Sequence, residues 1–394
     1  MIDIKENSQC CGCEACVQRC PKRSISLIED VEGFLYPHVD KSTCIDCGLC
    51  EKVCPIINQS VERQPQSVFA AINPDLDTRL LSSSGGIFSA LAYAVLDQGG
   101  VVFGVCWDKD WRLVFDYCEH VEDLARFRGS KYLQANVGDA YIKAEQFLKS
   151  GRQVLFTGTP CQIAGLKKYL RRDYDNLLSV DVICHGAPSS KVWKSYLDEQ
   201  KSIIEHDRGV KYEIEAVSFR DKSDSWKNYN FALDLRSVDG RVERFVQPFV
   251  QNIFMRGFLN DIYLRPSCYS CPARLGKSGS DITLGDFWGI KALRPEINDA
   301  QGVSAVCINT TQGASWFNFL SLEHYPMSYA DVCRCNFALV RSVVCPPQRA
   351  KFFALYGKEP FMSLVDDLCR IPFSLRVIKK IKNILRRIYK LIFR

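Results

Sequence analysis

Residues 10–21 read CCGCEACVQRCP, and residues 44–55 read CIDCGLCEKVCP. Both stretches have the spacing C-x2-C-x2-C-x3-C-P, so the chain begins with an internal repeat. Three thiolates at this spacing bind one 4Fe-4S cubane, and the fourth cysteine of each run ligates the other cluster. We therefore expect residues 1–60 to form an α+β ferredoxin-like module with two 4Fe-4S clusters.

The repeat predicts two ligand sets that exchange their last members. The first set is Cys10, Cys13, Cys16 and Cys54, and the second is Cys44, Cys47, Cys50 and Cys20. A pair of zinc sites is the alternative, but zinc motifs usually pair cysteines in twos and do not need the x3-C-P ending. Cys11 lies outside the spacing, and we interpret it as a bystander. Residues 24–40 alternate apolar and polar side chains around Gly33, which predicts a small hairpin.

The cysteine content also bears on the compartment. The chain has 394 residues, 47% of them hydrophobic, and 20 cysteines. Its first residues show no basic segment followed by an apolar one, so we expect a cytoplasmic protein whose thiols bind metal rather than form disulfides. The longest apolar runs are shorter than the roughly 20 residues that span a bilayer.

Beyond a polar linker, short apolar runs alternate with helical patterns. The expected strands are 67–72, 101–107, 153–158 and 177–184, with helices after Gly86 and over 165–172. This alternation predicts an α/β domain with a largely parallel sheet over residues 67–360, in an N-terminal part (67–150) and a C-terminal part (151–310).

Four further cysteines of this domain suggest a third cluster. Cys161 and Cys184 follow consecutive expected parallel strands, so both emerge at the same sheet edge. Cys268 and Cys271 supply the two thiolates that complete a set of four. Spacing alone leaves other interpretations open: Cys161 and Cys184 as small buried hydrophobes, and the Cys-x-x-Cys pair as half a zinc knuckle or a dithiol.

Six segments of the chain resemble, in order, signature segments of the family of coenzyme F420 hydrogenase/dehydrogenase beta subunits. They are SSSGGIFSAL (82–91), SKYLQANVGDAY (130–141), TGTPCQIAGLKKYL (157–170), DVICHGAPS (181–189), RPSCYSCPAR (265–274) and SDITLGDFWG (280–289). Members of this family are iron–sulfur flavoproteins, so the resemblance implies FAD and favours the third cluster. It also implies electron flow between ferredoxin or a redox partner subunit and a small organic substrate. A flavin suits that role because it is stable with zero, one or two electrons.

We thus expect an FAD-dependent iron–sulfur oxidoreductase, with a non-enzymatic electron-relay subunit of a larger redox complex as the alternative. For FAD, the candidates are Ser84, Gly85 and Gly86 before one helix, Thr157, Gly158 and Thr159 before another, and Lys131. Backbone N–H groups at a helix start favour phosphate, and glycines permit close approach. The alternatives are a serine cap with flexible glycines and a solvated lysine.

Other residues near the expected sheet edge carry two interpretations each. Asp286 and Trp288 suit a flavin or substrate cleft as well as core packing, and a lone histidine such as His185 is more often structural than catalytic. No residue is assigned as a catalytic acid. Structural thiols are the default interpretation of a later cysteine group, which comprises Cys333, Cys335 and Cys345.

The net charge of +6 is concentrated at the end of the chain, because residues 374–394 carry eight Lys or Arg and no acid. Apolar residues there recur at helical spacing, which predicts a basic amphipathic helix making peripheral contact with an anionic membrane. Docking on the protein itself or on an acidic partner is the alternative. Nucleic-acid binding is not expected, because no reading module accompanies the charge. A homo-oligomer stays an open alternative.

Overall fold

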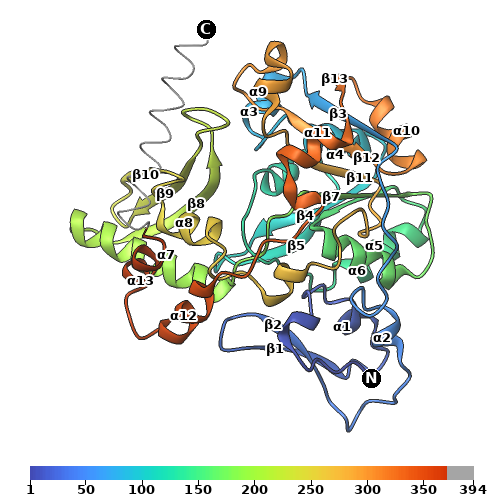
Figure 1. Cartoon of the computed structure of the whole chain (residues 1–394), viewed down its shortest axis with the longest axis horizontal. Coiled ribbons are helices and arrows are strands. Elements are labelled where there is room, and N and C mark those ends of the chain that lie inside the picture. Colours follow the sequence, from blue (N-terminus) through green and yellow to red (C-terminus); the bar gives the residue numbers. More distant parts are fainter. Residues whose placement is uncertain (371–394) are drawn as a thin grey trace.

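The computed structural model describes residues 1–370, and the predicted basic helix at 374–394 lies outside them. The chain forms an N-terminal module, a large mixed sheet covered by helices on both faces, and a second, smaller sheet with its own helices (Figure 1). No helix within residues 1–370 has the length and apolar character needed to cross a membrane.

The N-terminal module contains the predicted hairpin. Strands β1 (Ile25–Glu29) and β2 (Leu35–Val39) pair antiparallel on either side of Gly33. Each cysteine run enters a very short helix, α1 (Ala15–Arg19) or α2 (Leu49–Lys52), and a 3-10 turn, η1 (Asn7–Gln9), precedes the first run. The two short helices contact one another, so the repeated runs lie side by side.

The large sheet has eight strands. In spatial order they are β13 (Glu323–Pro326), β3 (Ser67–Ile72), β12 (Ser304–Ile308), β11 (Ile282–Asp286), β7 (Leu177–Val182), β6 (Val154–Gly158), β4 (Val101–Trp107) and β5 (Leu113–Cys118). The four neighbouring strands from β11 to β4 are parallel, in line with the largely parallel sheet that the sequence predicts, whereas β12, β3, β13 and β5 form antiparallel pairs with their neighbours. The parallel core is enough to bring the ends of β6, β7 and β11 to one edge.

Alternate residues of each central strand face opposite layers. On β6, Leu155 packs beneath α4 (Ile87–Asp97), while Phe156 faces α5 (Ala140–Lys149) and α6 (Pro160–Leu170). The remaining elements around this sheet are α3 (Leu76–Leu80), η2 (Val121–Phe127), α9 (Ile290–Leu293), η4 (Pro295–Ile297), α10 (Thr311–Phe319), α11 (Tyr329–Cys335) and η5 (Phe337–Leu339). Both faces of the parallel core are buried, as expected for such sheets.

The second sheet was not expected from the sequence. Its three antiparallel strands are β10 (Val242–Pro248), β9 (Asn230–Ser237) and β8 (Tyr212–Asp221). Around it lie α7 (Ser190–Arg208), α8 (Ile253–Leu259), α12 (Pro347–Leu355) and α13 (Phe361–Leu368) (Figure 1), while η3 (Pro266–Ser270) contacts η1 of the N-terminal module. An aromatic core holds this region together, with Trp193, Phe219 and Phe254 fully buried at its centre.

Arg265 ties the N-terminal module to the rest of the chain. Its side chain is 1% exposed, and its guanidinium donates to the backbone oxygens of Cys10 (2.7 Å) and Leu35 (2.9 Å) and to the side chain of Gln134 (2.9 Å). The guanidinium also lies 4.4 Å from the centre of the Tyr36 ring. A buried cation held by this many acceptors fixes the module in one position.

A carboxylate of the N-terminal module makes a second contact with the large domain. Glu14 accepts hydrogen bonds from the backbone N–H groups of Val137 (2.9 Å) and Gly138 (3.0 Å). Glu14 has a left-handed backbone, at φ 60°, and the matching position of the second repeat is Gly48, at φ 68°. A non-glycine residue adopts that conformation only when its surroundings hold it there, and here two hydrogen bonds do so.

Candidate cluster and cofactor site

The structure brings together each predicted ligand set of the N-terminal module. Cys10, Cys13, Cys16 and Cys54 line one small cavity, and Cys20, Cys44, Cys47 and Cys50 line another. Each cavity thus contains the first three spaced cysteines of one run and the last cysteine of the other, and the first cavity also contains Cys11. This is the exchange that the repeat predicts.

Backbone donors point at two sulfurs of the second set. The N–H of Ile2 lies 3.2 Å from Cys50 Sγ, and the N–H of Ser24 lies 3.3 Å from Cys20 Sγ. Such hydrogen bonds stabilise negative charge on a ligand sulfur and influence the potential of a cluster. Burial, together with the charge of Cys10, raises the pKa of the Cys16 thiol, so deprotonation requires a bound cation.

A much larger cavity, of about 500 Å³, lies at the ends of the central strands. Its wall contains Cys161, Cys184, Cys268 and Cys271, which come from three separate segments of the chain. The volume is within the usual range of ligand pockets.

Three local structures place these four thiols. Cys161 is in the first turn of α6, Cys184 follows β7 by two residues, Cys268 lies on η3, and Cys271 ends that turn. The hydroxyl of Thr159 is 3.3 Å from Cys161 Sγ, and the N–H of Ala187 is 3.4 Å from Cys268 Sγ. The sulfur-to-donor contacts seen in the N-terminal module therefore recur in the cavity.

The electrostatics also show that the four thiols are neighbours. Burial raises the pKa of the Cys184 thiol well above its usual value, and the charges of Cys268, Cys161 and Cys271 raise it further. Burial raises the pKa of Cys268 to about 12. Without a metal these groups stay protonated, whereas a bound metal deprotonates its thiol ligands outright.

A single metal ion has no ready site in this part of the chain. Within residues 1–370, no three or more His, Cys, Asp or Glu side chains form a group that holds one ion. A cubane makes a different demand on its ligands, because each of the four thiolates binds a different iron and the sulfurs surround the cluster.

The cavity also contains most of the residues predicted to bind FAD. Ser84, Gly86, Lys131, Thr157, Gly158 and Thr159 line it. Gly85 does not: its N–H donates to the Ser304 hydroxyl (3.0 Å), and a Cβ there would lie 2.5 Å from the oxygen of Ala71. Gly85 therefore permits close packing of its loop against β3 and β12.

The two small-residue turns use their side chains internally. Ser84 Oγ donates to the oxygen of Val303 (3.0 Å), and Thr157 Oγ1 donates to the oxygen of Phe103 (2.9 Å). Thr159 caps α6, with its N–H and hydroxyl both 2.9 Å from Gln162 Oε1. These bonds hold the turns rigid at the cavity wall.

Lys131 has an environment that its sequence neighbours do not reveal. Its ammonium donates to three backbone oxygens, at 3.3 Å to Phe127, 2.9 Å to Arg128 and 3.3 Å to Gly129. Burial lowers its pKa to about 8. The cavity thus contains a cation whose hydrogen bonds within residues 1–370 go to backbone oxygens and not to a carboxylate, and this cation favours an anionic ligand.

Asp286 and Trp288 line the cavity, and both are tightly packed. Asp286 forms an ion pair with Arg220 (2.7 Å) and accepts a hydrogen bond from Trp226 Nε1 (2.7 Å). The Trp226 and Trp288 rings are stacked at 5.4 Å. Asp286 and Trp288 therefore both line the cavity and take part in packing, so the two interpretations of the sequence hold at the same time.

His185 is also at the cavity, where its Nε2 lies 2.6 Å from Asp261 Oδ1. Sequence reasoning missed the partners Asp261, Arg220 and Arg265, because nothing in the local pattern connects residues so far apart. For Arg265 the sequence offered one signal, because this residue lies close to Cys268 in the RPSCYSCPAR segment.

The C-terminal cysteine group does not line these sites. Cys333 contacts the Tyr329 hydroxyl, Cys335 faces Gly289, and Cys345 is exposed. None of the three lines the large cavity or the two cavities of the N-terminal module.

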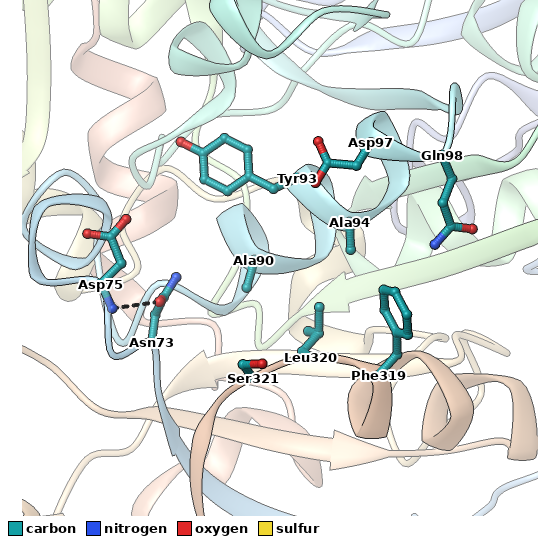
Figure 2. Close-up of a pocket in the computed structure, with 10 residues that line it drawn as sticks. All are labelled: Asn73, Asp75, Ala90, Tyr93, Ala94, Asp97, Gln98, Phe319, Leu320 and Ser321. Atoms are coloured by element: carbon teal, nitrogen blue, oxygen red, sulfur yellow. Dashed lines mark hydrogen bonds between the residues drawn. The ribbon is translucent and has the colours of Figure 1, made fainter.

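A separate cavity of about 330 Å³ lies between α4 and the end of α10 (Figure 2). Its wall contains Asn73, Tyr93, Asp97 and Phe319 but no cysteine. It offers no ligands for a cluster.

Comparisons with known proteins agree with this geometry. Residues 68–140 and 151–325 match the N-terminal and C-terminal parts of the coenzyme F420 hydrogenase/dehydrogenase beta subunit, and together they make up more than half of the chain. Residues 9–56 match a 4Fe-4S dicluster domain. A ferredoxin-like iron–sulfur region followed by a mixed α/β domain is therefore established.

Two curated relatives are archaeal redox proteins. The chain is 23% identical over 195 residues to one of the subunits of the F420H2 dehydrogenase of Methanosarcina mazei, covering 47% of this chain and 55% of that one. It is 24% identical over 192 residues to a coenzyme F420-dependent sulfite reductase of Methanocaldococcus jannaschii, covering 47% and 29%. The match thus spans about half or less of these relatives' own length.

A solved structure gives a further comparison. A chain of the F420-reducing [NiFe] hydrogenase complex of Methanosarcina barkeri superposes with a TM-score of 0.44 at 17% identity, covering 78% of this chain and 93% of that one.

Proposed function

Because the chain belongs to the family of coenzyme F420 hydrogenase/dehydrogenase beta subunits, we propose that it is an FAD-dependent iron–sulfur oxidoreductase. It takes electrons from ferredoxin or a redox partner subunit into two 4Fe-4S clusters of the N-terminal module. A third cluster and FAD in the large cavity connect the module to a small organic substrate.

One observation carries this proposal. Four cysteines spread from residue 161 to residue 271 line the same cavity as the small-residue turns before α4 and α6. A structural role for the thiols alone does not explain why all four lie at the wall of a cavity that also contains a partly buried cation. A cluster next to a flavin does.

The donor sets fit 4Fe-4S clusters. Cys10, Cys13, Cys16 and Cys54 would hold the first, and Cys44, Cys47, Cys50 and Cys20 the second. Cys161, Cys184, Cys268 and Cys271 would hold the third. Arg265 and Arg274 are both buried, and their positive charges act on Cys268 and on Cys184 respectively, which offsets the negative charge of the thiolates.

The cavity wall also fits FAD. Ser84, Gly86 and Thr157–Thr159 form turns in which small side chains leave the backbone accessible, and Lys131 supplies positive charge for a pyrophosphate. When bound, FAD would supply the change from one-electron to two-electron chemistry. Aromatic side chains on the same wall, Tyr229, Phe258 and Trp288, exclude water and offer flat surfaces to rings.

The protein's own residues keep this site rigid. Arg220 lies 4.2 Å from the Tyr229 ring centre and 5.2 Å from that of Trp288, while its ion pair holds Asp286. The second sheet therefore positions three residues of the cavity through one buried guanidinium. A preorganised wall of this kind lowers the cost of binding a planar ligand.

The proposal is tested by electron transfer in the anaerobically purified protein. Dithionite-reduced ferredoxin should bleach the bound FAD of the parent, and much more slowly that of a Cys268→Ser/Cys271→Ser variant. Because the names of two relatives include coenzyme F420, this deazaflavin is one acceptor to test alongside simple quinones. Absence of bound flavin from the purified parent, even after incubation with FAD, would contradict the proposal.

Reoxidation of the reduced parent distinguishes the two functions considered for the chain. Rapid reoxidation by a small organic acceptor supports the oxidoreductase. Slow reoxidation by every small acceptor, with rapid reoxidation by a partner protein, supports the electron relay.

A further inference from the structure

Cys11 lies between the two candidate cluster sites. It lines the large cavity together with Cys161, and it lines the small cavity that contains Cys13. Within residues 1–370, no other residue lines both of these cavities. The thiol that lies outside the cysteine spacing is therefore the one at the boundary.

Cys11 has neighbours in both the N-terminal module and the large cavity. Cys11 and Cys13 are buried in the same core cluster, and Cys161 packs against that cluster. Both neighbours belong to ligand sets of the proposed function, one in the N-terminal module and one in the cavity. Cys11 itself belongs to neither set of four.

The backbone around Cys11 is held firmly by the large domain. Gln134 Nε2 donates to the oxygens of Cys11 (3.4 Å) and Gly12 (3.3 Å), and Arg265 Nε donates to the oxygen of Cys10 (2.7 Å). Gly12 has φ +68°, and a Cβ there would meet Gln134 at 2.0 Å. Cys11 is 8% exposed, so the protein covers nearly all of its surface.

Helix α6, at the wall of the large cavity, also comes close to the N-terminal module. On α6, a Cβ added to Gly165 would lie 2.8 Å from Cys13 Cβ and 3.1 Å from Cys13 Sγ. Cys161, which lines the large cavity together with Cys11, lies one turn earlier on the same helix. The absence of a side chain at Gly165 thus allows the two ligand sets to approach each other.

We propose that Cys11 is a positioning residue that joins the first N-terminal cluster to the cavity cluster and influences their potentials. This inference rests on the proposed third cluster. Cys11 forms no bond to iron and exchanges no proton in the transfer: one electron is lost on the Cys13 side and one is gained on the Cys161 side. An S–H at this boundary can donate to a neighbouring ligand sulfur, and hydrogen bonds to ligand sulfurs are among the factors that set cluster potential.

The test is a redox titration followed by electron paramagnetic resonance on the full chain with its clusters. The variants are Cys11→Ala, which removes the S–H donor, and Cys11→Ser, which replaces it with a hydroxyl donor on a shorter side chain. Cys118→Ala is the matched control, because Cys118 is a buried cysteine on β5 outside all three ligand sets. Iron and sulfide content are measured for each protein.

In Cys11→Ala we expect unchanged iron and a lower midpoint potential for one of the two clusters. The expected shift corresponds to about a tenfold change in the ratio of oxidised to reduced cluster, or ~59 mV for one electron. Cys11→Ser should shift less, and Cys118→Ala should match the parent.

Two results in the variants would overturn the inference. One is a set of potentials in Cys11→Ala that all equal those of the parent. The other is loss of about four irons from the Cys11 variants, which would make Cys11 a ligand. A parent with only about eight irons would instead refute the third cluster, so failure of the proposed function is distinguishable.

Discussion

The chain holds its cysteines in two different ways. In the N-terminal module, eight of them lie in two short runs, and their spacing alone predicts which will meet. In the large domain, four come from a helix start, a strand end and a 3-10 turn, and only the tertiary fold brings them together. A group of cysteines can thus be brought together by local spacing or by the fold, and each kind of group is disrupted by different mutations.

The largest effect on stability is expected where the two regions join. Arg265→Met removes the donor to Cys10, Leu35 and Gln134 and leaves three partly buried acceptors without this partner. We expect a loss of about 3 kcal/mol in the free energy of unfolding, because each unsatisfied buried group costs on the order of 1–3 kcal/mol. Urea denaturation measures it, and limited proteolysis should release residues 1–66.

Arg265→Lys is the control for this prediction, since it keeps the charge but not the fork of donors. Its loss should be smaller than that of Arg265→Met. If Arg265→Met is as stable and as resistant to protease as the parent, the two regions do not depend on this contact.

A smaller loss of stability is expected from a substitution on α6, where this helix packs against the N-terminal module. Gly165→Ala places a methyl group 2.8 Å from Cys13 Cβ and 2.9 Å from the Tyr141 hydroxyl. Overpacking of this kind costs about 1–3 kcal/mol. Thermal unfolding should show the loss, and iron release should begin from the module. A stable variant with all its iron would mean that the helix moves freely to accommodate the methyl group.

The cation of the cavity gives a pH-dependent prediction. Lys131 has a pKa of about 8, so it is charged at pH 7 and mostly neutral at pH 9. Affinity of the apoprotein for FAD should fall as the pH rises through 8, because the positive charge is lost. Lys131→Met should bind FAD about tenfold more weakly at pH 7, equivalent to ~1.4 kcal/mol, with a flatter pH profile.

Titration of flavin fluorescence measures these affinities. The same pH dependence in the parent and in Lys131→Met would exclude Lys131 as its source.

The smallest effect is expected outside both regions. Cys345 is exposed and far from the ligand sets in the sequence, so Cys345→Ser should change stability by less than about 0.5 kcal/mol. Iron content should equal that of the parent. A loss of iron would show that the chain has a ligand set that neither spacing nor sheet topology identifies.

Sequence patterns predicted the parts of the fold that depend on local order. The hairpin around Gly33, strands β3, β4, β6 and β7, and the helix after Gly86 follow from spacing and alternation, and the helix expected over 165–172 is present as α6, which begins earlier, at Pro160. The antiparallel outer strands and the second sheet could not be predicted, because strand direction and pairing depend on contacts between distant residues. For the same reason, the family resemblance was needed to favour the cavity ligand set.

Individual side chains divide in the same way. The place of Ser84 and Thr159 at the cavity wall could be predicted, because each precedes a helix. Gly85 instead faces β12 through one backbone hydrogen bond that no sequence pattern reveals. The bystander interpretation of Cys11 followed from spacing, yet its neighbour Cys161 is far away in the sequence. Spacing describes a residue's local role and says nothing about what the fold brings beside it.

The most direct test of the central claim is the iron, sulfide and flavin content of the anaerobically purified protein beside its Cys268→Ser/Cys271→Ser variant. At four irons per cubane, a set of ligands encoded by topology predicts about twelve irons and one FAD in the parent, and about eight irons in the variant. About eight irons in both proteins would contradict it, because the four cavity thiols would then hold no cluster.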